Sequence, residues 1–225
     1  TLLPGLVLFS KKRIIYYGGL VCTMIILLMC MKRGAILIGV ILSINLIYNA
    51  FKRSGRFGKY ITILMSLLII AFSYKYVNTL YSNNEYFQGR IESTLEGNSS
   101  GRNTIANTVI NSFMQNTNIF QVLFGRGADS TIEIIGNYAH NDWLEILTNQ
   151  GLVGIVIFLF FWLFFLNEIA SLKHNSPYRQ IMLQIFIIYF LSSLFSMSYN
   201  QVTTISALLM GYCLYYGNIF KHKLK

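Results

Sequence analysis

The chain has 225 residues, of which 54% are hydrophobic and only 12% are charged, and its formal net charge is +10. A soluble domain usually carries about 25% charged residues, so this composition excludes an ordinary soluble domain and indicates an integral membrane protein. The positive charge does not indicate nucleic-acid binding, because the basic residues lie in short clusters between apolar runs, where membrane proteins keep their cytoplasmic anchors.

Six apolar segments follow one another along the chain, and each approaches the ~20 residues that cross a ~30 Å hydrocarbon core. They cover residues 14–31, 34–51, 60–77, 151–169, 180–197 and 202–220. Because only a helix satisfies its own backbone polar groups within such a segment, the sequence predicts an all-α integral membrane protein with about six transmembrane helices. The cysteines Cys22, Cys30 and Cys213 fall inside these segments without metal-site spacing, so we expect small buried apolar residues.

The basic residues predict the orientation of these helices. One face of the membrane would carry 12 of the 18: Lys11, Lys12, Arg13, Lys52, Arg53, Arg56, Lys59, Lys173, Arg179, Lys221, Lys223 and Lys225. Lysine and arginine gather on the cytoplasmic side of membrane proteins, so both ends of this chain are predicted to be cytoplasmic.

Residues 78–150 form the one long hydrophilic segment, and they contain every acidic residue except Glu168. The predicted orientation makes this segment extracytoplasmic, and its aromatic and β-branched residues suggest that it folds on the membrane surface. We therefore divide the chain into three spans in 1–77, a loop in 78–150 and three spans in 151–225, which together form one membrane domain.

Two helices are expected within this loop. Residues 102–124 form an amphipathic pattern, with Ser99, Ser100 or Asn103 as capping residues and with an apolar face made of Ile105, Val109, Ile110, Phe113 and Met114. Residues 142–149 predict a second, short helix, and Gly151 and Gly154 mark its junction with the fourth span.

Nucleotide-binding and metal-binding motifs are absent from the sequence: it has no Walker A motif, no HExxH and no paired histidines. We therefore expect no cofactor and no metal. The candidate functional residues on the predicted outer side are therefore three arginines and a histidine: Arg33, Arg102, Arg126 and His140.

Three of these residues, Arg33, Arg102 and His140, have both an ordinary interpretation and a functional one. Arg33 is either a membrane anchor or, since arginine near bilayer depth costs ~2.5–3.5 kcal/mol, the partner of an anion. Arg102 is either a surface residue or, because it stands at a predicted helix start, part of a phosphate site. His140 is either a capping residue or a general base, since an imidazole is largely neutral near pH 7 and can accept a proton.

Several short motifs follow one another along the chain in an order that resembles a known protein family. Lys32-Arg33-Gly34 opens a span, and SGR at 100–102, LFGRG at 123–127, HND at 140–142 and NQGLVG at 149–154 follow. Over residues 32–155 this series resembles the O-antigen ligase and O-antigen polymerase superfamily of bacterial membrane proteins. Members usually have about ten to twelve spans, so this chain looks like the C-terminal portion. Many also have a tryptophan shortly after the loop arginine, where this chain has Ile105 and Ala106.

The resemblance implies a polymerase or ligase for O-antigen, capsular or exopolysaccharide chains in the bacterial cell membrane. It would transfer a glycan from undecaprenyl diphosphate to an acceptor hydroxyl on the outer face, without a metal. Arg33, Arg102 and His140 map onto the family's essential residues, whereas Arg126 fills a variable position between two glycines. Beside them, Arg126, Asp142, Trp143 and Tyr138 are candidates for substrate binding. Asp142 either holds acceptor hydroxyls or orients the imidazole, and Trp143 and Tyr138 either stack on sugar rings or, as we favour, anchor the loop. The implied partners are the lipid-linked oligosaccharide, membrane lipid and polysaccharide-assembly proteins.

The alternative is a non-catalytic polytopic membrane protein, such as a component of a polysaccharide or lipid transporter. Transport usually requires broken or charged helices in the middle of the membrane, and here the last three spans contain almost no charge apart from Glu168 near a span end. The two hypotheses differ in where Arg33, Arg102 and His140 lie: an enzyme requires them at one place on the outer face.

Overall fold

The computed structural model describes residues 2–9, 12–29, 32–95, 101–174, 176–196 and 204–222, and within these ranges it contains helices and no strand. The predicted all-α fold is confirmed. The helices are α1 (Leu2–Leu6), η1 (Val7–Phe9), α2 (Arg13–Met29), α3 (Arg33–Arg53), α4 (Arg56–Asn83), α5 (Glu85–Leu95), α6 (Arg102–Met114), α7 (Ile119–Phe124), α8 (Ser130–Ile135), α9 (Asp142–Ser171), α10 (Pro177–Phe195) and α11 (Thr204–His222).

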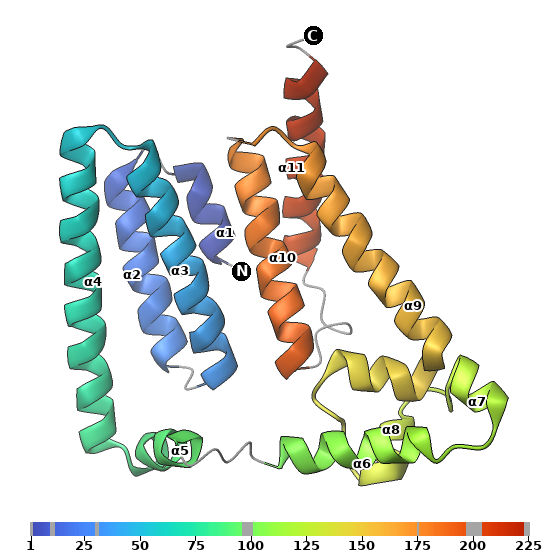
Figure 1. Ribbon diagram of the computed structural model, residues 1–225. Helices are drawn as coiled ribbons and strands as arrows, with labels where there is room; N and C mark the ends of the chain where they lie inside the picture. Colours follow the sequence, from blue (N-terminus) through green and yellow to red (C-terminus); the bar gives the residue numbers. More distant parts are fainter. Residues whose placement is uncertain are drawn as a thin grey trace.

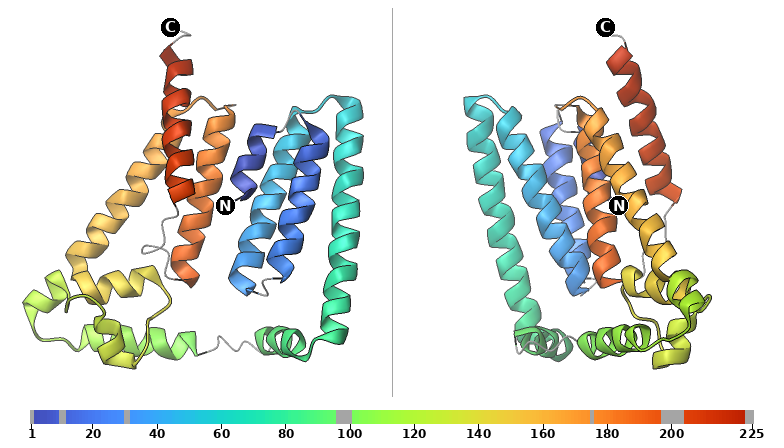
Figure 2. Two further views of the ribbon diagram at one scale, coloured as in Figure 1. Left: turned by 180° about the vertical axis from the view of Figure 1, so that it is seen from behind. Right: turned by 45° about the vertical axis from the view of Figure 1, so that its right-hand side comes forward.

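The long helices form a bundle, and the short helices of the loop lie across one end of it. In Figures 1 and 2, α2, α3, α4 and α10 run side by side, whereas α5, α6 and α8 lie beneath them. α10 packs against both α3 and α9, so it joins the first group of long helices to the second. The loop is therefore a layer that covers one end of the bundle.

Within the part of the chain that the structure describes, four helices are long and apolar enough to cross a membrane: residues 34–53, 56–83, 142–171 and 177–195. α2 is apolar but shorter, and α11 coincides with the last predicted span, although its side chains are described only over 207–217. The total of six spans therefore stays a prediction. Only 11% of the apolar window of α4 is buried, which fits a helix whose side chains face lipid.

The core lies where α2, α3 and α10 meet, at fully buried Leu20, Leu46, Ile181 and Ile185. Trp162 of α9 packs edge-to-face against Phe186 and Phe190 of α10, with ring centroids 5.4 and 5.2 Å away. The Tyr16 hydroxyl is satisfied within the bundle, because it donates to the Leu46 carbonyl at 2.8 Å. Among the described residues, the buried Gln184 amide and the Trp162 indole nitrogen have no hydrogen-bond partner.

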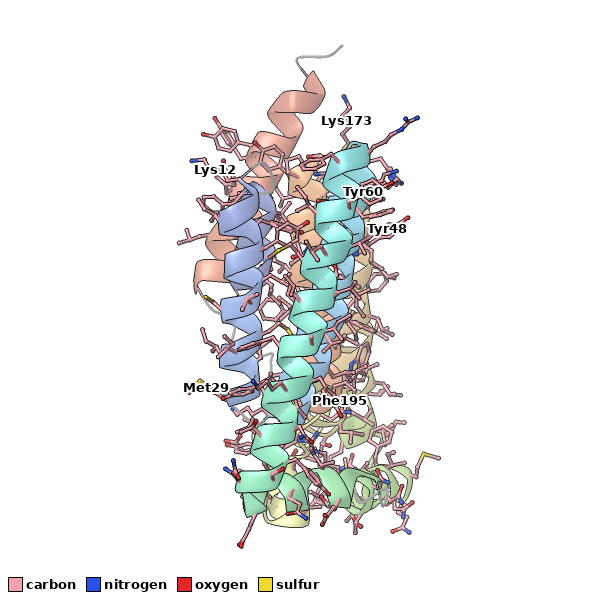
Figure 3. All side chains as sticks on the ribbon, turned by 90° about the vertical axis from the view of Figure 1, so that its left-hand side faces the viewer. Lys12, Met29, Tyr48, Tyr60, Lys173 and Phe195 are labelled. Atoms are coloured by element: carbon pink, nitrogen blue, oxygen red, sulfur yellow. The ribbon has the colours of Figure 1, made fainter. Side chains whose placement is uncertain are left out.

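The predicted basic clusters lie at the end of the bundle away from the loop. Figure 3 shows Lys12, Tyr60 and Lys173 near that end, and Met29 and Phe195 near the end covered by α5 and α6. The first residues of α4 and the last residues of α3, which carry four basic side chains, also lie there. The assignment of this end to the cytoplasm remains a prediction from the positive-inside pattern.

The single predicted helix over 102–124 is wrong, because the chain breaks between α6 and α7. The Asn116 side chain accepts a hydrogen bond from the Asn118 amide at 3.0 Å. Asn118 then caps α7 by accepting from the amides of Phe120 and Gln121. Asparagine side chains offer the backbone such local alternatives to a continuous helix. The start of α6 also differs: its N-cap is Gly101, with φ 77°, while Ser99 and Ser100 lie outside the described residues.

The predicted short helix and glycine junction at the fourth span are confirmed. α9 contains a break at Gly151, with φ 67° and ψ −160°, so residues 142–150 and 152–171 point in different directions. A Cβ at Gly151 would lie 2.6 Å from the Leu123 carbonyl oxygen and 2.6 Å from the Gly125 amide nitrogen. Both the left-handed backbone and this close approach require glycine.

Candidate active site

His140 lies on the turn between α8 and α9, and its backbone is left-handed, with φ 52°. Its side chain is exposed, whereas the preceding Ala139 is buried and donates its amide hydrogen to Glu145 Oε1 at 2.5 Å. A non-glycine residue in this conformation costs ~1–2 kcal/mol, although histidine adopts it more readily than most residues. The turn thus holds the imidazole outward from a backbone that is fixed on its N-terminal side.

Asn141 fixes the other side of the turn. Its Oδ1 accepts hydrogen bonds from the amides of Trp143 at 2.9 Å and Leu144 at 3.2 Å, so it is the N-cap of α9. Its Nδ2 donates to the carbonyl of Leu194 at 3.1 Å, in the last turn of α10. Sequence reasoning missed this residue, although an asparagine directly before an Asp-Trp helix start is a recognisable capping signal.

Two carboxylates beside the turn are fully buried: Asp142 and Glu145. Glu145 Oε2 accepts a hydrogen bond from Thr131 Oγ1 at 2.7 Å, and its other oxygen accepts from Ala139, so the group is satisfied on both sides. Asp142 is in the first turn of α9, where the helix dipole favours a negative charge. The surface beside His140 is therefore formed by other residues, and the expected contact of Asp142 with substrate stays a prediction.

Trp143 anchors the first part of α9, residues 142–150, against α10. Its indole Nε1 donates to Ser193 Oγ at 3.1 Å, and its ring lies edge-to-face with Phe158, with centroids 4.9 Å apart. Tyr138, which is half-buried, donates its amide hydrogen to Asn137 Oδ1 at 2.8 Å. The indole contacts explain Trp143 as a support of the turn, and the predicted contact of Trp143 and Tyr138 with sugar rings stays untested.

Arg126 ties the loop helices together. Its amide donates to the Thr148 carbonyl at 2.9 Å, and the next amide, of Gly127, donates to the Asn149 carbonyl at 3.1 Å. The Arg126 guanidinium donates through Nη2 to the Ser112 carbonyl at 3.1 Å, near the C-terminus of α6. A cation in this place satisfies a late helix carbonyl and complements the helix dipole.

Arg102 is the first residue of α6 and its side chain is exposed. In the three views of Figures 1 and 2, the N-terminal end of α6 lies below the end of α10, on the side of the bundle that the loop covers. The guanidinium thus lies at a helix N-terminus, where unpaired amides and the dipole also favour an anion.

Arg33 is the first residue of α3, at the same end of the bundle. A Cβ built on the next residue, Gly34, would lie 3.8 Å from Cβ of Phe195. Asn141, the neighbour of His140, binds the carbonyl of Leu194, so the neighbours of Arg33 and of His140 lie beside consecutive residues at the end of α10. The structure therefore brings the start of α3 and the histidine turn together, and it places the start of α6 beneath them.

A cavity of about 410 Å³ is present, but its lining residues, among them Tyr16, Asn49 and Arg53, lie toward the opposite end of the bundle. The described side chains contain no group of three or more histidine, cysteine, aspartate or glutamate residues close enough to hold a metal.

These features define a polytopic α-helical membrane protein whose loop layer presents an exposed histidine and exposed arginines at one end of the bundle. The sequence matches the family model described as O-antigen ligase over residues 18–159, so the chain belongs to the O-antigen ligase family. The predicted resemblance is confirmed. Comparison with curated proteins and with solved structures gave no significant match.

Membership in this family gives the protein an O-antigen ligase-like glycosyltransferase function in the membrane, on lipid-linked polysaccharide. The matched range begins in α2 and ends in the membrane-crossing part of α9. It therefore includes all seven residues that the sequence singled out for the site.

Proposed function

We propose that this protein transfers a glycan from an undecaprenyl-diphosphate carrier to an acceptor hydroxyl at the outer face of the bacterial cell membrane. One observation carries the proposal beyond the family: His140 is exposed on a fixed turn whose neighbour Asn141 binds the end of α10, beside the start of α3. The same end of the bundle has Arg102 at the N-terminus of α6. These three residues come from three separate elements, and we propose that the His140 imidazole acts there as a base and Arg33 and Arg102 as cations.

The chemistry requires charge stabilisation and proton removal. A bond forms between the acceptor oxygen and the anomeric carbon of the donor sugar, and the bond from that carbon to the diphosphate oxygen breaks. Negative charge then grows on the departing diphosphate. Arg33 and Arg102 supply permanently charged, forked donors for those oxygens, so that the cation requirement is met by this chain's own residues.

His140 takes the proton that the acceptor hydroxyl loses. General-base catalysis of this kind contributes ~10²–10⁴-fold in rate. The left-handed backbone at His140, held by the Ala139 and Asn141 hydrogen bonds, presents the imidazole away from the buried carboxylates of Asp142 and Glu145. The side chain is therefore open to an acceptor that arrives from the aqueous side.

Polymerase and ligase share this chemistry and differ in the acceptor. A polymerase uses another lipid-linked repeat, whereas a ligase uses a lipid core, a protein or the cell wall. We favour a polymerase for capsule or exopolysaccharide, because the loop layer is small and rich in asparagine. Polysaccharide-assembly proteins are the further partners that this assignment implies.

The test replaces His140 in the full-length enzyme, purified and supplied with a synthetic undecaprenyl-diphosphate glycan. His140→Asn is the informative variant, because asparagine tolerates a positive φ and so retains the turn while it removes the imidazole. We expect the transfer rate to fall by ~10²–10⁴-fold in both His140→Asn and His140→Ala, with thermal stability of the asparagine variant unchanged. Transfer at the wild-type rate by either variant would show that His140 is not the base.

A further inference from the structure

α7 exposes apolar side chains that no other part of the described chain covers. The exposed fractions are 60% for Ile119, 72% for Phe120 and 60% for Phe124, and Leu123 between them is also exposed. Only Gln121 and Val122 are partly buried, and the helix contains no charged residue. Such a cluster on a polar loop predicts an apolar contact outside the described chain.

The position of α7 relative to the membrane is fixed by its junction with α9. Gly125, directly after α7, lies so close to Asn149 and Gln150 that a Cβ there would come within 2.4 Å of their backbone atoms. The hydrogen bonds from Arg126 and Gly127 to the carbonyls of Thr148 and Asn149 hold the same two segments together. α7 is therefore attached to α9 just before Gly151, where the membrane-crossing part begins.

The apolar surface of α7 continues into the lipid-facing surface of α9. Beyond Gly151, α9 exposes apolar side chains over successive turns: Leu152, Val153, Val156, Ile157 and Phe160. Figure 1 shows α7 beside the lower end of this rising part of α9. Met114, at the C-terminus of α6, is exposed as well and lies just before the turn that leads to α7.

We infer that α7 is an interfacial membrane anchor: its Ile119, Phe120, Leu123 and Phe124 side chains enter the boundary between headgroups and acyl chains of the leaflet on the loop side. Helices that lie in this plane bury an apolar face in lipid and hold their polar face in the headgroup layer. Because α7 is fixed to α9 and, through Arg126, to α6, this contact sets the height of the whole loop layer. The inference does not depend on the proposed catalytic function.

The experiment measures the depth of single positions in the bilayer. The full-length protein, with Cys22, Cys30 and Cys213 replaced by alanine, receives one new cysteine for a nitroxide label and is reconstituted in phosphatidylcholine–phosphatidylglycerol nanodiscs. The test positions are Phe120 and Phe124. Ile157, exposed on α9, is the lipid-facing reference, and Asn107, exposed on α6, is the water-facing reference.

We expect labels at 120 and 124 to collide with membrane-soluble oxygen more than with a water-soluble nickel chelate, as at Ile157, while the label at Asn107 shows the reverse. Ile119 serves as a replacement position if one variant is not recovered. Water-type accessibility at both test positions would overturn the inference. Low accessibility to both reagents would overturn it too, because another polypeptide would then cover α7 instead of lipid.

Discussion

Three consecutive residues on the histidine turn have three different environments. Ala139 is buried and gives its amide to a buried carboxylate, His140 is exposed with φ 52°, and Asn141 caps α9 while it binds α10. The sequence indicated the histidine, because an isolated imidazole before a span is chemically conspicuous. It did not indicate the Asn141–Leu194 contact, since that bond joins residues 53 positions apart and depends on the packing of α10 against α9.

Asn141 offers a test of this support at the residue scale. We expect Asn141→Ala to lower the free energy of unfolding by about 1 kcal/mol through loss of the cap and to reduce transfer as the turn loosens. Asn141→Asp is the matched control, because aspartate still accepts from the Trp143 and Leu144 amides but cannot donate to the Leu194 carbonyl.

Thermal unfolding of the purified variants and their transfer rates separate the two roles of Asn141. If the aspartate variant retains stability and loses activity, the bond to α10 positions the histidine. If both variants unfold at the wild-type temperature and transfer at the wild-type rate, Asn141 has no positioning role.

At the scale of elements, apolar spacing predicted the long helices well and the loop helices less well. Runs of about 20 apolar residues leave few alternatives to a helix, and α3, α4 and α10 lie where such runs occur. The apolar residues of the 102–124 segment have helical spacing throughout. However, the side chains of Asn116 and Asn118 accept hydrogen bonds from nearby backbone amides between the end of α6 and the start of α7. Side-chain capping of this kind is decided by geometry within a few residues, and periodicity alone does not detect it.

The break in α9 is the element-scale feature most open to test. Gly151→Ala would force a side chain into a left-handed backbone and against Leu123 and Gly125. The backbone at Gly151 combines φ 67° with ψ −160°, a region essentially restricted to glycine. We expect the free energy of unfolding to fall by ~1–3 kcal/mol for the backbone and by a further ~1–3 kcal/mol for overpacking, measured by thermal unfolding.

Gly136→Ala is the control for the backbone contribution to this loss. Gly136 also has a positive φ of 71°, with ψ 5°, which is the left-handed helical conformation that costs a non-glycine residue ~1–2 kcal/mol. A Cβ there would meet no atom within 4 Å. Gly136→Ala should therefore lower the free energy of unfolding only by the backbone contribution. Equal losses for the two alanine variants would mean that α7 does not press against α9 at this point.

At the scale of the whole molecule, the loop layer and the basic helix ends occupy opposite ends of the bundle. This separation fits a glycosyltransferase with its site on one side better than a transporter, which needs a pathway through the middle of the membrane. The break that the structure shows in a membrane helix, at Gly151, lies where α9 meets the loop layer and not within its crossing part.

The sidedness itself can be measured with cysteine accessibility in intact bacterial cells after the outer barrier is permeabilised. Single cysteines replace Glu133 on α8 and Lys173 between α9 and α10, both of which are exposed. A membrane-impermeant maleimide should label position 133 and leave position 173 unlabelled until the cells are lysed. Labelling of 173 alone before lysis would place the loop in the cytosol and remove the proposed site from the lipid-linked donor.

The end of α10 has a mechanical consequence for the whole site. Phe195 abuts the start of α3, and the carbonyl of Leu194 holds the histidine turn through Asn141. Tilting or sliding of α10 would move the start of α3 and the histidine turn in the same direction, so the spacing between the proposed cation, Arg33, and the proposed base, His140, would survive small movements of the bundle. Under the proposed function, a long glycan that pulls on the loop layer during transfer would leave the two proposed reacting groups at the same separation.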